Sequence, residues 1–222
     1  MPFGYHRRIL HVDLTDGSIF QERPGDDFYR KYLGGSAMGM YYILNGVSPG
    51  TDPLGPENIL TLMLSVLTGA PISGQSRLTA NAKSPLVDGI GDSQSGGFFP
   101  AELKFAGYDG IVVKGQSEEP VYLWIKDGVT ELRSATHLWG KTTGAVDDIL
   151  KEELCDKKIE IMQCGPAGEK LSCLAAIISM ANRANGRTGL GAVMGSKRLK
   201  AVVVRGTSKK FPVAEPKQLN DF

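Results

Sequence analysis

The chain has 222 residues, of which 41% are hydrophobic, and this suits one large domain or two small halves that share a core. Lys and Arg total 25 against 24 Asp and Glu, so a net charge of +1 argues against a nucleic-acid partner. No apolar run approaches the roughly 20 residues of a membrane span, so no membrane partner is expected either.

The three cysteines, Cys155, Cys164 and Cys173, are odd in number and lack Cys-x-x-Cys spacing. They are typical of reduced thiols in a cytoplasmic protein rather than of a metal site.

The first half of the chain predicts a hairpin, helices and further strands. Residues 8–14 alternate apolar and polar, and Asp16-Gly17 is a hairpin-turn signal before Ile19 and Phe20. Asp26 and Asp27 could cap the helix that follows. The expected elements are strands over 8–14 and 19–20, helices over 26–33 and 37–44 interrupted at Gly34-Gly35, and strands over 59–67 and 77–82.

The second half repeats this order. Asp127-Gly128 separates two strand-like segments, and Thr142 or Thr143 opens a helix with Val146 and Leu150 on one stripe. Antiparallel hairpins with few helices predict an α+β fold of two related β-sheet units, a duplicated arrangement of strands, helix and strands. The elements expected here are strands over 121–125 and 129–132, a helix from 142 or 143, and strands over 158–162, 171–178 and 199–205. We expect one domain over 1–208 and the start of a connection to a second domain over 209–222.

Glycine is over-represented, at 28 of 222 residues, against a usual share of about 7%. It concentrates in three stretches, 67–86, 91–109 and 183–197, each of which adds hydroxyls or a fixed positive charge. Exposed backbone N–H groups, hydroxyls and arginines are the groups that bind a phosphorylated polar cofactor.

Other interpretations of these segments are plain turns, ion pairs and strand edges. Gly189-x-Gly191-x-x-x-Gly195 misses the dinucleotide-binding spacing, and no phosphate-binding P-loop pattern is present. Glu102 and Lys104 could be an acid–base pair, although an ordinary surface salt bridge is the simpler expectation. Lys197, Arg198 and Lys200 are expected at the solvated edge of a strand. His6, His11 and His137 show no ligand spacing and are expected to be structural.

Many of these segments resemble the aldehyde:ferredoxin oxidoreductase family. The similarity follows the family's order and covers nearly the whole chain up to Gly206. The matching segments are 67–69, 83–86, 95–97, 101–109, 121–123, 137–141, 165–169 and 189–197. The chain is identified as resembling the family's amino-terminal domain.

The resemblance implies a base of two β-sheet units that carries a tungsten, or molybdenum, bis-molybdopterin cofactor. A magnesium ion that joins the two pterin phosphates would be held by the backbone carbonyls of Gln94 and Ala184. Family members often have Asn where this chain has Gln94, but a main-chain ligand tolerates that change. The cofactor-binding residues implied by motif are Arg77, Ser95, Gly96, Gly97, Arg183, Ala184, Gly186 and Arg187, and we expect Arg77, 95–97 and 183–187 to line one polar hollow.

The activity implied is oxidation of a small aldehyde to a carboxylic acid, with electrons passing through a four-iron four-sulfur cluster to ferredoxin. The family's cluster cysteines and acid–base residues lie in later domains, so no catalytic residue is assigned here and this chain alone is expected to be inactive. A fragment is favoured over one subunit of a split enzyme; in either case the partner carries the iron–sulfur cluster. Alternatives are an aryl-thioester reductase on the same scaffold, a non-catalytic pterin- or phosphate-binding module, and a nucleotide-binding protein of another class.

Overall fold

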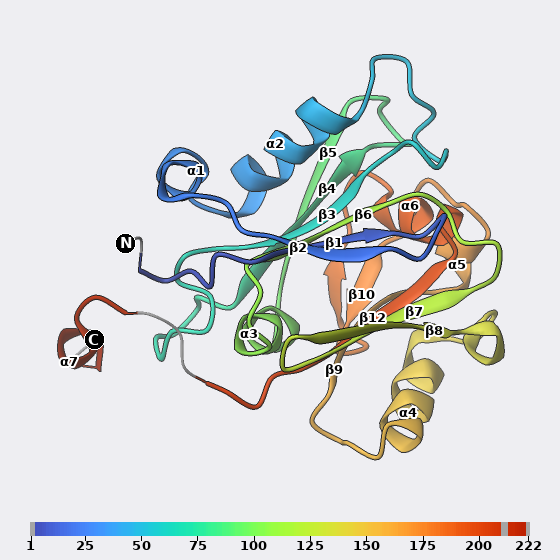
Figure 1. Cartoon of the computed structure of the whole chain (residues 1–222). Helices are drawn as coiled ribbons and strands as arrows, with labels where there is room; N and C mark the ends of the chain where they lie inside the picture. The colour runs from blue at the N-terminus through green and yellow to red at the C-terminus, as the bar shows by residue number, and fades with distance from the viewer. Residues whose placement is uncertain (1–2, 210–212, 221–222) are drawn as a thin grey trace.

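The computed structural model describes residues 3–209 and 213–220 and contains two units in chain order (Figure 1). The first unit forms one mixed sheet with three helices. Its elements are β1 (Ile9–Asp13), β2 (Ile19–Glu22), α1 (Asp26–Tyr32), α2 (Gly35–Gly46), β3 (Leu60–Leu64), β4 (Arg77–Lys83), β5 (Ile90–Gly96), α3 (Phe99–Phe105) and β6 (Gly110–Lys114).

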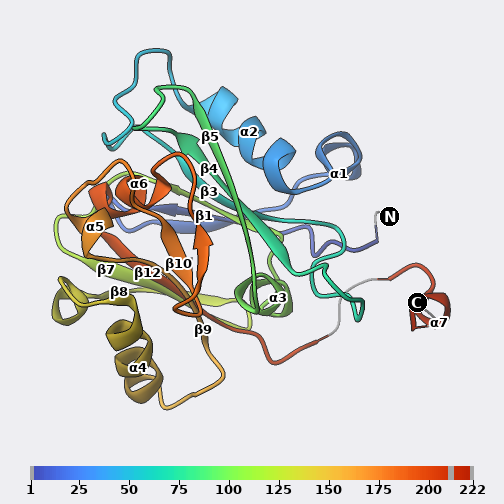
Figure 2. The same cartoon turned by 180° about the vertical axis from the view of Figure 1, so that it is seen from behind.

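The second unit forms the other sheet. Its elements are β7 (Val121–Lys126), β8 (Val129–Ser134), the 3-10 turn η1 (Thr136–Leu138), α4 (Thr143–Glu153), β9 (Glu160–Cys164), α5 (Pro166–Glu169), β10 (Ile177–Ser179), β11 (Arg183–Asn185), α6 (Leu190–Ser196) and β12 (Leu199–Arg205). Helix α7 (Pro216–Asn220) follows and lies near the N-terminal segment, where Val213 and Leu219 line a groove with Phe3 and Val66 (Figure 2).

The two sheets have the same topology. Their strand orders are β2-β1-β6-β3-β4-β5 and β8-β7-β12-β9-β10-β11. In each unit a hairpin comes first, the last strand pairs parallel with the first, and the remaining strands are antiparallel. The predicted α+β class and the duplication are therefore confirmed.

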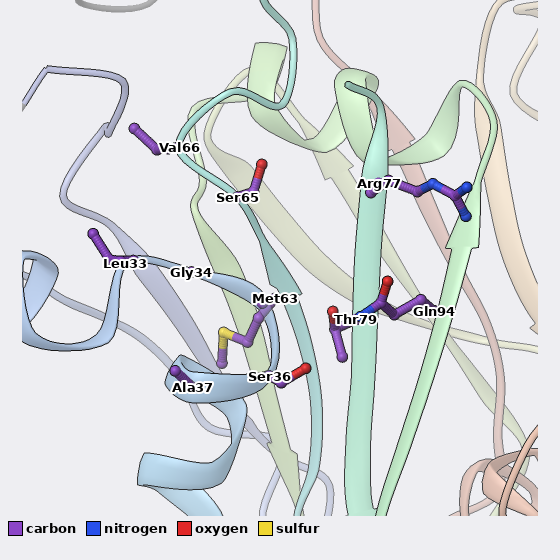
Figure 3. A pocket seen from close by; sticks show the side chains of 11 residues that line it. Leu33, Gly34, Ser36, Ala37, Met63, Ser65, Val66, Arg77, Thr79 and Gln94 are labelled. Atoms are coloured by element: carbon purple, nitrogen blue, oxygen red, sulfur yellow. The ribbon is translucent and has the colours of Figure 1, made fainter. Parts of the chain in front are cut away.

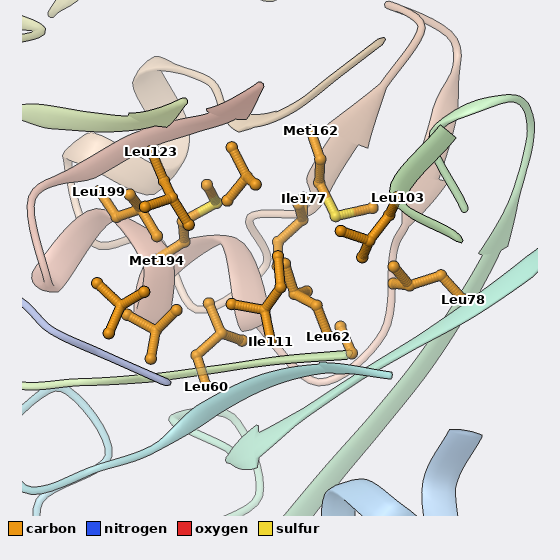
Figure 4. Close-up of a cluster of buried hydrophobic side chains, with 14 of the residues drawn as sticks. Leu60, Leu62, Leu78, Leu103, Ile111, Leu123, Met162, Ile177, Met194 and Leu199 are labelled. Atoms are coloured by element: carbon orange, nitrogen blue, oxygen red, sulfur yellow. The ribbon is translucent and has the colours of Figure 1, made fainter. Parts of the chain in front are cut away.

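The sheets face each other across the main core. Aliphatic side chains from both sheets and from α3 and α6 fill the space between them (Figure 4). Helices α1 and α2 cover the outer face of the first sheet, and α4 covers the outer face of the second (Figures 1 and 2). The layered order explains why β3 and β12, which are covered on both sides, are nearly continuous apolar runs.

Local signals account for several of these elements. Asp127 and Gly128 both have positive φ, at 47° and 86°, as a two-residue type I′ hairpin turn requires. Thr142 caps α4 by accepting a hydrogen bond from the Ala145 N–H, and Val146 and Leu150 are the buried stripe of that helix. Helix α1 differs from expectation, because Gly25 is its N-cap and no side chain caps it.

One predicted element is wrong, and several elements of the structure were not predicted. The expected strand over 171–178 is reduced to β10, because the chain before it forms α5 and turns. Strands β5 and β6 and helices α3 and α6 were not predicted. Helix α6 holds two glycines because it packs closely against neighbouring backbone. A Cβ added at Gly191 would lie 2.4 Å from the Ala176 carbonyl oxygen, and one added at Gly195 would lie 2.1 Å from the Gly168 carbonyl oxygen.

Two of the three basic residues after α6 are buried rather than solvated, whereas Arg198 is exposed. Lys197 and Lys200 are both 0% exposed. The Lys197 ammonium donates to the carbonyls of Pro56, Asn58 and Gly115, and so ties the second unit to the first. The Lys200 ammonium donates to two carbonyls and pairs with Glu169. The expectation of a solvated strand edge is wrong for the two lysines, because backbone carbonyls and the Glu169 carboxylate satisfy their charges internally.

Glu102 and Lys104 do not pair with each other. Buried Lys104 forms an ion pair with Asp109 at 2.8 Å, and Glu102 accepts a bond from Arg205 at 2.7 Å. Asp109 also accepts hydrogen bonds from the Tyr29 hydroxyl and the His6 backbone N–H. Both carboxylates are therefore anchors between distant segments, and the surface salt bridge is not formed.

Within the described residues, no helix has the length and apolar character needed to cross a membrane. The expected connection over 209–222 falls in part on residues 210–212 and 221–222, which lie outside the described residues.

Candidate functional site

The two units meet at the free edges of β5 and β11. The Ser95 hydroxyl donates to Asn185 Oδ1 at 2.8 Å, and Asn185 Nδ2 donates to the Ser93 carbonyl at 2.6 Å. The Arg187 N–H donates to Ser93 Oγ at 3.1 Å. These three bonds place equivalent strands of the two units side by side.

A polar hollow of about 590 Å³ lies along this junction, and we call it the cradle. Among the described residues its lining holds no acid, histidine or cysteine, and neither of its guanidinium groups forms an ion pair. It can therefore bind an anionic or polar ligand but offers no group for proton transfer at neutral pH. The lining residues are Gly74, Gln75, Ser76, Arg77, Gln94, Ser95, Gly96, Gly97, Phe98, Met180, Asn182, Arg183 and Ala184.

Most of the residues expected from the sequence come together here. Arg77 begins β4, and Gln94, Ser95, Gly96 and Gly97 end β5 or follow it. Arg183 and Ala184 enter the same hollow from β11. The segments around Ser95 and Asn185, which are 90 residues apart in the sequence, therefore meet at the cradle.

Gly186 and Arg187 are not part of the cradle lining. Both are exposed, beyond the end of β11, and the Arg187 backbone is fixed by its bond to Ser93. The structure therefore separates this pair from the other expected residues, although they continue the same segment.

Gly97 allows close packing at the rim of the cradle. Its φ of +111° favours glycine, and an added Cβ would lie 2.7 Å from Met180 Sδ. The Phe98 N–H donates to that same sulfur at 3.1 Å. Met180 and Ala181 both have positive φ, at 52° and 55°, in the turn between β10 and β11. The turn and the glycine together shape the rim.

Sequence reasoning missed several lining residues, including Ser76, Met180 and Asn182. Ser76 Oγ donates to the Gly97 carbonyl at 2.6 Å and joins the two segments of the first unit. Ser76 immediately precedes Arg77 in a glycine-rich stretch, so its position in the sequence could have indicated that it lines the site. Met180 carries no such signal, because only folding brings it against Gly97.

The fold joins two equivalent β-sheet units over one polar hollow, whose described lining has no group for proton transfer at neutral pH. The model of the aldehyde ferredoxin oxidoreductase N-terminal domain matches residues 9–206. The chain belongs to this family, as its amino-terminal domain.

Relatives and a solved structure agree with this assignment. The chain is 46% identical over 213 residues to the tungsten-containing aldehyde ferredoxin oxidoreductases of Pyrococcus abyssi and of Thermococcus kodakarensis, covering 96% of this chain and 35% of each relative. It is 33% identical to the WOR-like subunit of an aliphatic sulfonate oxidoreductase of Pyrococcus furiosus, over 92% of the chain and 35% of that relative.

Among solved structures it resembles the active-site complex BamBC of benzoyl coenzyme A reductase in complex with 1,5-dienoyl-CoA. The TM-score is 0.91 at 38% identity, over 94% of this chain and 32% of that one. The chain thus spans about a third of the length of the proteins it matches.

Proposed function

We propose that the cradle holds a tungsten, or molybdenum, bis-molybdopterin cofactor and that the protein is an oxidoreductase. The observation that carries this proposal is the junction of β5 and β11, which joins two equivalent edges over one polar hollow. Within the part of the chain that the structure describes, this hollow of about 590 Å³ holds guanidinium groups without ion-pair partners and no acid, which fits a phosphorylated, dianionic organic ligand. The tungsten-containing names of the relatives support the metal.

Two kinds of contact would hold the cofactor, charged side chains and main-chain groups. Arg77 and Arg183 would bind phosphate or ring heteroatoms through their planar guanidinium groups. Ser95, Gly96 and Gly97 would contact a pterin mainly through main-chain groups, and Gly186 and Arg187 would extend the second unit's side. The carbonyls of Gln94 and Ala184 would hold a magnesium ion between the phosphates. The chain fits the cofactor at Arg77, 94–97, Arg183 and Ala184; Gly186 and Arg187 would need a ligand that reaches beyond the cradle.

When bound, the cofactor supplies two-electron redox chemistry at its metal. The chain's own residues bind and orient it, since the described lining has no proton-transfer group. We propose that the reaction is oxidation of a small aldehyde to a carboxylic acid, with a four-iron four-sulfur cluster and ferredoxin as electron carriers. The cluster and the acid–base residues would belong to further domains or to a partner subunit, with residues 1–208 forming the first domain and 209–222 the connection.

A second candidate is reduction of an aromatic thioester on the same scaffold. It is favoured by the TM-score of 0.91 to a complex of benzoyl coenzyme A reductase. The two activities separate in one assay of the purified protein with its partners: aldehyde-dependent reduction of a viologen dye supports the first, and aryl-thioester-dependent oxidation of a reduced dye supports the second.

Cofactor retention tests the proposal more directly. In Arg77→Ala and Arg183→Ala variants, tungsten or molybdenum measured by plasma mass spectrometry, together with pterin fluorescence after oxidation, should fall several-fold. Arg30→Ala is the control, because Arg30 is exposed on α1, away from the cradle. Circular dichroism should show the same fold in all three. Wild-type metal and pterin content in both cradle variants would refute the proposal.

A further inference from the structure

A second, smaller hollow of about 350 Å³ adjoins the cradle, and we call it the α2 hollow (Figure 3). It lies between the start of α2 and strands β3 to β5, and shares Arg77 and Gln94 with the cradle. Its lining residues are Leu33, Gly34, Gly35, Ser36, Ala37, Met63, Ser65, Val66, Arg77, Thr79 and Gln94.

The beginning of α2 offers backbone donors to this hollow. The helix has 12 residues, its N-cap is Gly34, and no side chain caps it. The first-turn N–H groups of an α-helix have no partner within the helix, and they carry the positive end of its dipole. Gly35, Ser36 and Ala37 form that first turn, and all three line the hollow. Such an end favours an anionic oxygen.

Thr79 is an independent sign of a ligand. It lines the hollow from β4 and is only 5% exposed. Its hydroxyl has no hydrogen-bond partner among the residues that the structure describes. The residue is buried, but Thr79 Oγ1 is not one of the fully enclosed unpaired atoms, so this oxygen is accessible and can bond a group that enters the hollow. Figure 3 shows the Ser36 hydroxyl and the Gln94 amide directed toward Thr79 from opposite sides.

Gly35 keeps the space in front of Thr79 open. A Cβ added at Gly35 would lie 3.1 Å from Thr79 Oγ1, and its φ of +54° favours glycine. The lack of a side chain here therefore leaves both the Thr79 hydroxyl and the first-turn amides accessible to one small group.

Charge selects the kind of group. Arg77 is the only charged residue in the lining, and within the described chain it forms no ion pair. A helix N-terminus and the Ser36 and Thr79 hydroxyls, with no carboxylate among the described lining residues, are complementary to a tetrahedral or planar oxyanion. Figure 3 shows the Arg77 guanidinium turned away from Ser36 and Thr79, so it adds positive charge near the hollow rather than a donor inside it. A neutral apolar ligand would leave all of these donors unsatisfied.

We propose that the α2 hollow is an oxyanion-binding subsite, for a phosphate or carboxylate group, built from the first turn of α2 and Thr79, with the charge of Arg77 nearby. It does not depend on the metal or on the pterin, so it can hold or fail separately from the proposed function. The oxyanion has two possible sources, a free anion or an acidic group carried by the ligand in the cradle.

Inorganic phosphate is the probe for the subsite. On cofactor-free protein, titration with phosphate should shift the amide resonances of Gly35 and Ser36 in a nitrogen–proton correlation spectrum and give a saturable affinity. Thr79→Val keeps the shape and removes the hydroxyl, and should weaken binding about tenfold. Ser36→Asp places a carboxylate where the anion would sit and should abolish binding, while an acid in the first turn suits the helix.

Ser48→Asp is the matched control, because it adds the same charge on the exposed loop after α2 and should bind phosphate as wild type does. Equal phosphate affinity in wild type and Ser36→Asp, or no saturable shift at Gly35 and Ser36 in wild type, would overturn the subsite. Since Ser36→Asp is expected to fold even if Thr79→Val does not, the test stands on either variant.

Loading the cofactor distinguishes the two sources. If phosphate no longer shifts these amides in the loaded protein, the oxyanion belongs to the ligand in the cradle; if the shift persists, the subsite takes a free anion. Both results support the subsite. Neither uses metal content, so a protein that binds phosphate but retains no tungsten or molybdenum would refute the proposed function alone.

Discussion

The Ser95 hydroxyl donates to Asn185 Oδ1 at 2.8 Å, across the boundary between the two units. Ser95 is 4% exposed and Asn185 is 0% exposed, so the bond is shielded from water. The other end of the Asn185 amide donates to the Ser93 carbonyl at 2.6 Å. One buried amide therefore clamps β5 to β11 directly beneath the residues that line the cradle.

Asn185→Ala should weaken this junction. The change removes both bonds and leaves the Ser93 carbonyl and the Ser95 hydroxyl without this partner, which should cost about 2–3 kcal/mol. Urea unfolding monitored by circular dichroism measures this loss in the free energy of unfolding. Asn45→Ala is the control, since exposed Asn45 bonds only the Tyr41 carbonyl of its own helix. An equal loss of stability in the two variants would show that the junction is not clamped by this amide.

Gly97→Ala should distort the rim of the cradle. A methyl group there lies 2.7 Å from Met180 Sδ on a backbone with φ of +111°, and we expect a loss of about 1–3 kcal/mol. Cofactor content should fall as well. Gly144→Ala is the matched control, because nothing lies within 4 Å of its added Cβ and it sits in α4; it should gain about 0.5–1 kcal/mol. A Gly97→Ala protein as stable as wild type would contradict this role.

Lys197→Met should strongly destabilise the fold. The Lys197 ammonium bonds three carbonyls from the first unit, and losing them should cost about 3 kcal/mol. Lys158→Met, at an exposed position, should change stability little.

The cost of Lys197→Met should also depend on pH. Burial lowers the pKa of Lys197 to about 8, although Asp13 and Glu57 oppose the shift. Because the folded pKa lies below the usual value of 10.5, the unfolded chain binds more protons between pH 8 and 10.5. Wild-type stability should thus rise relative to Lys197→Met across that window. Chemical unfolding at pH 7 and pH 10 measures the difference, and a constant difference would contradict the burial of a titrating ammonium.

Glu160→Gln should stabilise the protein above neutral pH. Burial, followed by the charge of Glu102, raises the pKa of Glu160 to about 7 from 4.5. A raised folded pKa gives a contribution that is present below pH 4.5 and is lost as pH rises through 7. The variant should therefore melt higher than wild type at pH 8 and lose that advantage near pH 4.5. Glu152→Gln, at an exposed position, is the control. A difference in melting temperature between Glu160→Gln and wild type that stays constant from pH 4.5 to 8 would rule out the effect.

Periodicity and turn chemistry predicted the outline of the fold. The Asp127-Gly128 turn and the Val146–Leu150 stripe carry local signals strong enough to place β7, β8 and α4. Strand β5 lacks such signals, since glycines and small polar residues fill it, and the two glycines of α6 weaken its helical signal. Glycine is required in α6 because close packing against another backbone leaves no room for a side chain, as at Gly191. That cause is tertiary and leaves no periodic trace.

The cradle was predictable in part, through the resemblance rather than through spacing. Arg77, Gly96 and Gly97 are implied by the family's motifs, whereas Met180 is not. Lys197 was misread because basic residues are ordinarily solvated. Only the folded chain shows the carbonyls of Pro56 and Gly115 converging on its ammonium.

Each unit returns its final strand to lie parallel beside its opening strand, β6 against β1 and β12 against β7. A unit built this way is closed before the next one begins, so a tandem copy of its coding segment would need only the short stretch between Lys114 and Val121 as a joint. The two units share this topology and meet edge to edge at β5 and β11, so equivalent strands of two like units border the hollow at their junction.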